Sequence, residues 1–159
     1  YTLALASIQT SWRFACNQFD QIESLSAQGV NAYGYWFTDQ EAPSLFGPQL
    51  TAGLSFDLGA AHALEIQYVL NSADTMLSRG ASENQIALSE QMIQYWVQFA
   101  RNGDPSTSDG TATWPTFDNG SELMKLEPTT LGNDALVDAS VAQDAHNCDY
   151  WATPPTVTP

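Results

Sequence analysis

The chain has 159 residues, of which 43% are hydrophobic and 11% aromatic, so it carries enough apolar material to build a folded core. Eighteen Asp and Glu residues against four Lys and Arg residues give it a formal net charge of −14. Such a charge repels phosphate backbones and anionic headgroups, which argues against nucleic acid and membrane-surface partners, and no apolar run is long enough for a transmembrane helix.

The amino-terminal part of the chain predicts a helix, a strand and a loop. Apolar residues at steps of three or four predict an amphipathic helix over Ser7–Ala27, ended by Gly29. The aromatic, strand-favouring residues of Val30–Thr38 then predict a buried strand. Pro43–Leu58 has two Pro, two Gly and no sustained period, which predicts a long loop of the kind that is often functional. The apolar positions of the helix are Ile8, Trp12, Ala15, Phe19, Ile22 and Leu25.

The second half of the chain contains the clearest helix signal. Ser82 and Gln85 have the spacing of a capping box, an apolar stripe follows, and Gly103 supplies a left-handed end, so a helix is predicted over Ser82–Asn102. The stripe consists of Leu88, Met92, Trp96 and Phe99. Leu123–Leu126 predicts a short edge strand, and apolar residues within Asp134–Trp151 predict a closing helix.

One histidine stands in a distinctive setting. His62 follows the long loop and precedes an apolar run, with Glu65 one turn later. It is either a core histidine satisfied by backbone groups or a general base, a role that suits imidazole because its pKa lies near neutrality. Glu65 is correspondingly either a solvated acid on the first turn of a helix or part of a site. His146 is expected at the surface of the last helix.

The two cysteines, Cys16 and Cys148, are far apart, which allows two free buried thiols, one bridge between them, or pairing elsewhere. No short ligand spacing for zinc is present, and phosphate-loop and dinucleotide fingerprints are absent from the sequence. No cofactor is therefore expected.

Several stretches resemble the type-B carboxylesterases, the cholinesterase-like family. The run GAAHALEIQYV at Gly59–Val69 is similar to the family's histidine segment, so the resemblance implies that His62 is the triad histidine. Glu65 matches an acidic residue that, in the family, lies in a buried polar cluster behind the active site. The likeness continues in AYGYWF at Ala32–Phe37, in MIQYWVQFARNGDP at Met92–Pro105 and in WPTF at Trp114–Phe117.

The resemblance also implies a disulfide. In many family members a cysteine before the aromatic strand pairs with one in a C-x-[FY]-W segment, and Cys16 and Cys148-Asp149-Tyr150-Trp151 match both. A Cys16–Cys148 bridge implies an oxidising compartment, so the protein is expected to be secreted or periplasmic.

The resemblance leaves parts of the catalytic machinery unaccounted for. The family's nucleophile lies in a G-x-S-x-G elbow and its acid is a glutamate upstream of the histidine, whereas this sequence has no such elbow. We therefore expect an α/β fold that is the carboxy-terminal portion of an α/β-hydrolase, with the last sheet strands and their packing helices, incomplete without its amino-terminal part. Residues 1–153 would form that segment of one domain, and residues 154–159 a Pro-rich tail.

The expected function is hydrolysis of a small-molecule carboxylic ester by a serine esterase, with His62 supplied by this chain and the isolated chain inactive. The serine and the triad acid would come from the amino-terminal part of the same protein. Phe46, Leu54 and Phe56, on the long loop, are candidates for the substrate gorge, with anchoring in the core as the alternative role. A non-catalytic recognition or adhesion domain on the same scaffold is the rival function. A third possibility is an independent domain with a structural His62.

Overall fold

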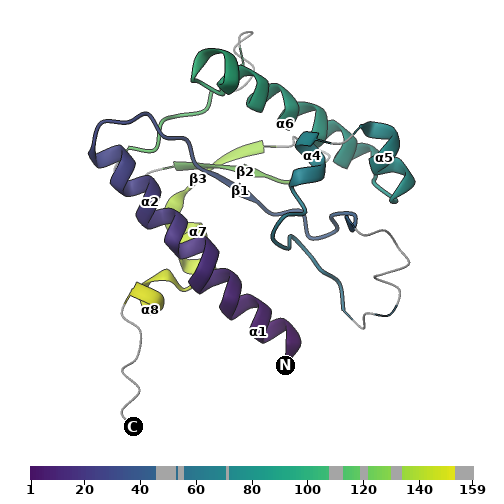
Figure 1. Cartoon of the computed structure of the whole chain (residues 1–159), viewed down its shortest axis with the longest axis horizontal. Coiled ribbons are helices and arrows are strands. Elements are labelled where there is room, and N and C mark those ends of the chain that lie inside the picture. Colours follow the sequence, from purple (N-terminus) through teal and green to yellow (C-terminus); the bar gives the residue numbers. More distant parts are fainter. Residues whose placement is uncertain are drawn as a thin grey trace. The chain divides into compact units, whose positions relative to one another are not determined.

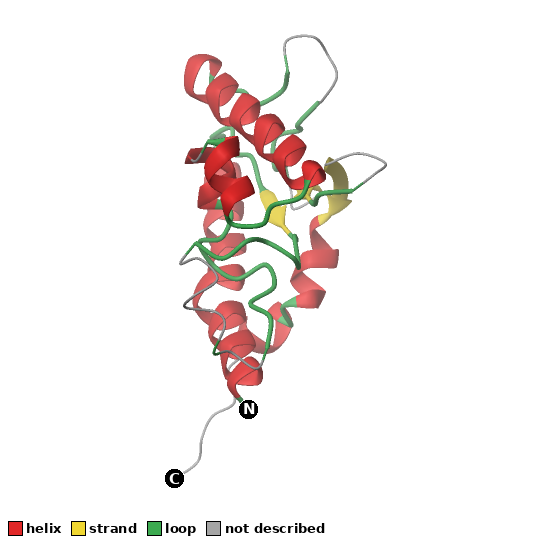
Figure 2. Ribbon diagram, turned by 90° about the vertical axis from the view of Figure 1, so that its right-hand side faces the viewer, coloured by secondary structure: helices red, strands yellow, loops and turns green. Residues whose placement is uncertain are grey.

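The computed structural model describes residues 1–45, 53, 56–70, 72–107, 113–118, 122–129 and 134–152. Helices and loops make up most of this part of the chain, and three short strands form one sheet (Figures 1 and 2). The chain divides into two compact units. The first combines Tyr1–Gly34, Pro115–Leu123 and Val137–Pro159, and the second combines Tyr35–Trp114 and Met124–Leu136.

The first unit begins with a long helical stretch. Helix α1 (Thr2–Gln9), the π-helical segment η1 (Thr10–Ala15) and helix α2 (Cys16–Ala27) follow one another without a break. The stretch starts earlier than the predicted Ser7 and ends where Gly29 was expected to end it. Gly29 takes the left-handed conformation, with φ of +75°, which a residue without a Cβ adopts at little cost.

The predicted apolar face of this helix is only partly covered. Phe19 is buried, whereas Ile8 and Trp12 are 46% and 52% exposed. Leu3 and Leu5, near the start of α1, are also more than half exposed. Apolar surface of this extent on one helix is unusual for a self-sufficient soluble domain.

The carboxy-terminal segment corrects the sequence prediction. Asp134–Trp151 is not one helix: strand β3 (Asp134–Asp138) is followed by helix α7 (Ala139–Ala145) and helix α8 (Cys148–Ala152). Asp138 ends the strand and caps α7, because its carboxylate accepts a hydrogen bond of 2.8 Å from the amide of Ser140. Asn147, with φ of +53°, separates the two helices.

The sheet of the second unit has the order β1-β2-β3. Strand β1 (Tyr35–Phe37) pairs in parallel with β2 (Glu122–Leu126), in the register Tyr35 to Met124. β2 is therefore the central strand, and the prediction of an edge strand at Leu123–Leu126 was wrong. β1 is much shorter than the predicted Val30–Thr38 and lies at the edge of the sheet.

Helices α4 (Ile66–Leu70), α5 (Ala73–Ser78) and α6 (Glu83–Asn102) complete the part of the second unit that the structure describes. Helices α4 and α5 pack against the long helix α6, as Figure 1 shows. α6 matches the prediction, with a reciprocal capping box between Ser82 and Gln85 and a left-handed Gly103 at its end. Its buried stripe differs in detail: Leu88, Met92 and Tyr95 are fully buried, whereas Phe99 is 49% exposed.

Candidate active site

His62 lies on a turn between the long loop and α4. The amide of Leu64 donates to the carbonyl of Ala61 over 3.1 Å, and the amide of Ile66 donates to that of Ala63 over 3.3 Å. Ala63 has φ of +75°, a left-handed conformation that is uncommon for a residue with a Cβ. The His62 side chain is exposed, so His62 is not a core histidine.

The flanks of the turn are anchored although its histidine is exposed. Leu64 is 3% exposed, and Gln67 and Tyr68 on α4 are fully buried. Before the turn, Gly59 has φ of +60°, and a Cβ at this position would meet Oε1 of Gln40 at 2.9 Å. The imidazole therefore lies on a short segment that is followed by buried residues and preceded by a glycine next to the Gln40 side chain.

A buried polar cluster lies behind this segment. Asp39, Tyr68 and Gln85 are 3%, 0% and 5% exposed. The Tyr68 hydroxyl donates to Oδ2 of Asp39, Nε2 of Gln85 donates to the same oxygen over 2.8 Å, and the Glu41 amide donates to Oδ1 over 2.9 Å. Burial, and next the Asp39 carboxylate, raise the pKa of Tyr68 far above its usual range, so its hydroxyl stays protonated.

Sequence reasoning missed the role of Asp39, Tyr68 and Gln85 in this cluster. No role was predicted for Asp39, and Gln85 was interpreted only as a capping residue. A usable signal existed, since an acidic residue directly after a buried strand often needs buried donors. Their partners, however, are 29 and 46 residues away in the sequence, so only folding brings them together.

Glu65, the predicted acid behind the histidine, is half-buried. It lies close enough to β1 to act on Tyr35: burial raises the pKa of the Tyr35 phenol, and the negative charge of Glu65 adds to that rise. Of the candidate gorge residues, Phe56 is half-buried, while Phe46 and Leu54 lie outside the described residues.

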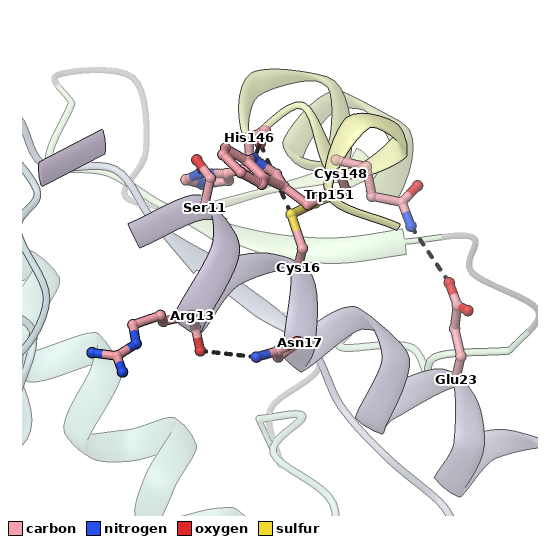
Figure 3. Close-up of a disulfide and its surroundings, with 9 residues drawn as sticks. Ser11, Arg13, Cys16, Asn17, Glu23, His146, Cys148 and Trp151 are labelled. Atoms are coloured by element: carbon pink, nitrogen blue, oxygen red, sulfur yellow. Dashed lines mark hydrogen bonds between the residues drawn. A yellow bond between two sulfur atoms is a disulfide. The ribbon is translucent and has the colours of Figure 1, made fainter. Parts of the chain in front are cut away.

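The two cysteines are joined in a disulfide within the first unit. Cys16 on α2 and Cys148 on α8 have their Cα atoms 5.3 Å apart, which confirms the bridge that the family resemblance implied and rules out two free thiols. Figure 3 shows this region, in which the carbonyl of His146 accepts a hydrogen bond of 3.1 Å from the Trp151 indole.

His146 is partly buried rather than a surface residue as predicted. Its Nδ1 lies 3.4 Å from Oγ of Ser11, which is itself buried. Burial lowers the pKa of the His146 imidazole below its usual value, because desolvation disfavours the charged form. His146 therefore has the properties of a packed structural histidine, in contrast to His62.

Within the part of the chain that the structure describes, no group of three or more His, Cys, Asp or Glu side chains is arranged to hold a metal ion. Among the same residues, no helix is both long and apolar enough to cross a membrane.

Comparison with known proteins shows which protein family the chain belongs to. Residues 1–151 match the family model described as "Carboxylesterase family". The chain belongs to the carboxylesterase family. It is 32% identical to liver carboxylesterase B-1 of Rattus norvegicus over 114 residues, which cover 72% of the chain and 19% of that relative. Identity to liver carboxylesterase 1 of Oryctolagus cuniculus is 37% over 81 residues, covering 51% of the chain and 14% of the relative.

A further relative carries a more specific name. The chain is 31% identical to acylcarnitine hydrolase of Rattus norvegicus over 109 residues, covering 69% of the chain and 18% of that protein. In each case the chain spans less than a fifth of the relative's length. The mixed α/β architecture, with parallel β1 and β2 and packed helices, is that of part of an α/β-hydrolase fold.

Proposed function

We propose that the protein carrying this chain is a type-B serine carboxylesterase and that His62 is its catalytic base. The observation that carries the proposal is the setting of His62: an exposed imidazole on an anchored turn, inside the segment that matches the carboxylesterase family. A buried structural histidine would have no comparable access to a substrate. The reaction is the hydrolysis of a carboxylic ester to a carboxylic acid and an alcohol.

The proposed mechanism assigns His62 a proton transfer in each half-reaction. The imidazole accepts the proton of a serine hydroxyl as the serine oxygen attacks the ester carbonyl, and then donates it to the leaving alcohol. In deacylation it accepts a proton from the attacking water and returns it to the serine oxygen as the acid is released. Glu65, one turn after His62, would contribute negative charge near the site without contacting the substrate.

The serine, the triad acid and the oxyanion-hole donors would come from an amino-terminal part of the same protein. Two observations support this partner. Among the described residues β1 lies at the edge of the sheet, where a further strand can be added, and the apolar side chains of α1 and η1 are exposed. We propose that residues 1–153 are the carboxy-terminal segment of one α/β-hydrolase domain and that they are inactive alone.

The disulfide and the loop bear on location and substrate. A bridge between Cys16 and Cys148 supports a secreted or periplasmic protein, since such bonds persist in oxidising compartments. Phe56, half-buried on the loop before His62, would contact the acyl or alcohol group of the ester. Phe46 and Leu54 on the same loop are proposed in the same role.

The test uses the full-length protein and the His62→Ala and His62→Gln variants. Hydrolysis of 4-nitrophenyl butyrate should fall about 10⁴-fold or more in kcat, because the serine loses its proton acceptor. The melting temperature should change far less than kcat, since the core of this segment is formed by the residues that flank the turn, such as Leu64 and Tyr68, and not by the His62 side chain.

The matched control is His146→Gln, which alters the chain's other histidine. This variant should keep kcat near that of the wild type. Near-normal turnover by His62→Ala would remove His62 from the mechanism. A wild-type protein without any ester hydrolysis would favour the recognition or adhesion function instead.

A further inference from the structure

We propose that Asp39 is a positioning residue for His62, because the segment Asp39–Gln40 holds the His62 turn from both sides. After the turn, Asp39 accepts a hydrogen bond from Tyr68 of helix α4. Before the turn, the side chain of Gln40 contacts Gly59. The inference deepens the proposed function and rests on it, since it assigns His62 the role of base.

The His62 turn needs support from outside itself. Ala63 holds a left-handed backbone conformation with φ of +75°, and such conformations persist in residues with a Cβ only where the surroundings determine them. His62 is exposed, so burial of its own side chain does not hold it in place. The residues that flank the turn therefore contribute to the position of the imidazole.

After the turn, the anchor is Tyr68. Its ring is fully buried and makes an edge contact with Phe37 of β1, with the ring centroids 5.1 Å apart. Its amide donates to the carbonyl of Glu65 over 3.0 Å, which ties the buried residue to the end of the turn. Its hydroxyl donates to Asp39, and Ser89 of α6 donates to its carbonyl over 2.7 Å.

Before the turn, the anchor is the contact of Gln40 with Gly59. The side chain of Gln40 donates to the carbonyl of Thr38 over 3.4 Å, and Oε1 lies against the face of Gly59 where a Cβ would be. Gln40 directly follows Asp39 in the chain. One short segment after β1 thus touches both ends of the region that carries His62.

The hydrogen bonds at position 39 require a carboxylate side chain. Its two oxygens accept from three donors: the Tyr68 hydroxyl and Gln85 Nε2 at Oδ2, and the Glu41 amide at Oδ1. A carboxylate has acceptors on both oxygens, whereas an asparagine side chain must present an NH₂ group on one side. In Asp39→Asn, the NH₂ group of the asparagine would therefore face at least one of these hydrogen-bond donors in a buried site, and that donor would lose its acceptor.

The chain offers a matched control pair. Tyr95 of α6 is also fully buried, and its hydroxyl donates to the carboxylate of Asp134 on β3. Burial, followed by Asp134, also raises the pKa of Tyr95. This tyrosine–aspartate pair is chemically like that of Tyr68 and Asp39, but it joins α6 to β3 and includes no residue of α4 or of the His62 turn.

The experiment compares Asp39→Asn and Tyr68→Phe with Asp134→Asn and Tyr95→Phe in the full-length protein. Hydrogen–deuterium exchange of the peptide Gly59–Tyr68 should speed up in the first pair and stay unchanged in the second. With 4-nitrophenyl butyrate, the first pair should lose about tenfold or more in kcat with KM within about twofold, because a base displaced by a fraction of an ångström transfers protons poorly.

Equal exchange and equal kcat in the two pairs would overturn the inference, because general destabilisation would then explain both. If Asp39→Asn does not fold, Tyr68→Phe, which keeps the buried ring, decides in the same way. Full turnover by His62→Ala would count against the proposed function instead. The exchange comparison would still show whether Asp39 holds the turn.

Discussion

The two histidines of the chain illustrate how strongly the surroundings decide what one residue type can do. His62 is exposed on a turn, whereas His146 is partly buried beside Ser11 with a lowered pKa. An exposed imidazole can exchange protons with a substrate and a nucleophile, while a packed one contributes mainly to folding. The sequence alone does not show which of the two histidines is exposed, and the apolar residues near His62 made a buried core position one of its two possible interpretations.

The lowered pKa of His146 predicts a pH dependence of stability. At a pH above the unfolded value of about 6.5 the imidazole is neutral in both states and has no effect. As the pH falls through that value, the unfolded chain takes up a proton more readily than the folded chain does. Stability is therefore lost as the pH falls from about 6.5 toward the lower folded pKa.

The measurement is the melting temperature of the full-length protein between neutral pH and mildly acidic pH, compared with that of His146→Gln. Titration of the carboxyl groups is common to both proteins, so their difference isolates His146. The wild-type melting temperature should fall more than that of the variant. Parallel curves would show that burial does not shift this histidine.

At the scale of elements, α6 shows what local signals can specify. A capping box at Ser82, a buried stripe and Gly103 agree on one helix, and the structure has it at Glu83–Asn102. Gln85 also links the helix start to the buried cluster: its Oε1 accepts from the Ser82 amide over 2.8 Å and its Nε2 donates to Asp39. The start of the helix is thus specified by local and distant contacts together.

Removal of the cap should have a measurable cost. In Ser82→Ala the amide of Gln85 loses its acceptor, now 3.3 Å away, and the free energy of unfolding should fall by about 1 kcal/mol. Urea unfolding of the full-length protein measures the change. Ser78→Ala removes an exposed hydrogen bond from the Ser78 hydroxyl to the Thr75 carbonyl at the end of α5, but no N-terminal cap, and should stay within about 0.5 kcal/mol of the wild type. A similar loss in both variants would contradict the cap's contribution.

The strand β3 shows where local signals mislead. Asp134–Trp151 has apolar residues that fit a helical period, yet Asp134–Asp138 pairs in the sheet and only the later residues are helical. β3 gains its backbone partners from the neighbouring strand β2 and not from within itself, so a helical period along its own sequence could not reveal it. The aromatic strand β1 was predicted in the right place, but its length was overestimated for the same reason.

At the scale of the whole molecule, the disulfide is the strongest long-range restraint. It joins residues 132 apart in sequence and connects α2 with α8. In the chain-entropy account a loop of this length stabilises the folded state by about 5 kcal/mol, and bridges in small domains contribute about 2–5 kcal/mol when measured.

Cys148→Ser should lower the free energy of unfolding by an amount in that range, about 2–5 kcal/mol, while the KM for 4-nitrophenyl butyrate stays unchanged. Cys16→Ser and the double variant should each lose the same amount, since either change removes the same bond. Denaturant unfolding under oxidising conditions measures this. Additive losses in the double variant would show that the cysteines act independently.

Local sequence patterns predicted the helix α6, and the resemblance to the carboxylesterases implied the family, the pairing of Cys16 with Cys148 and the candidate base His62. The family, the helix and the disulfide are confirmed. Only the tertiary structure decided that β2 is central, that Asp134–Asp138 is a strand, and that Asp39 meets Tyr68 and Gln85. The physical reason is that strand pairing and buried hydrogen bonds join separate segments of the chain, and no local pattern records their partners.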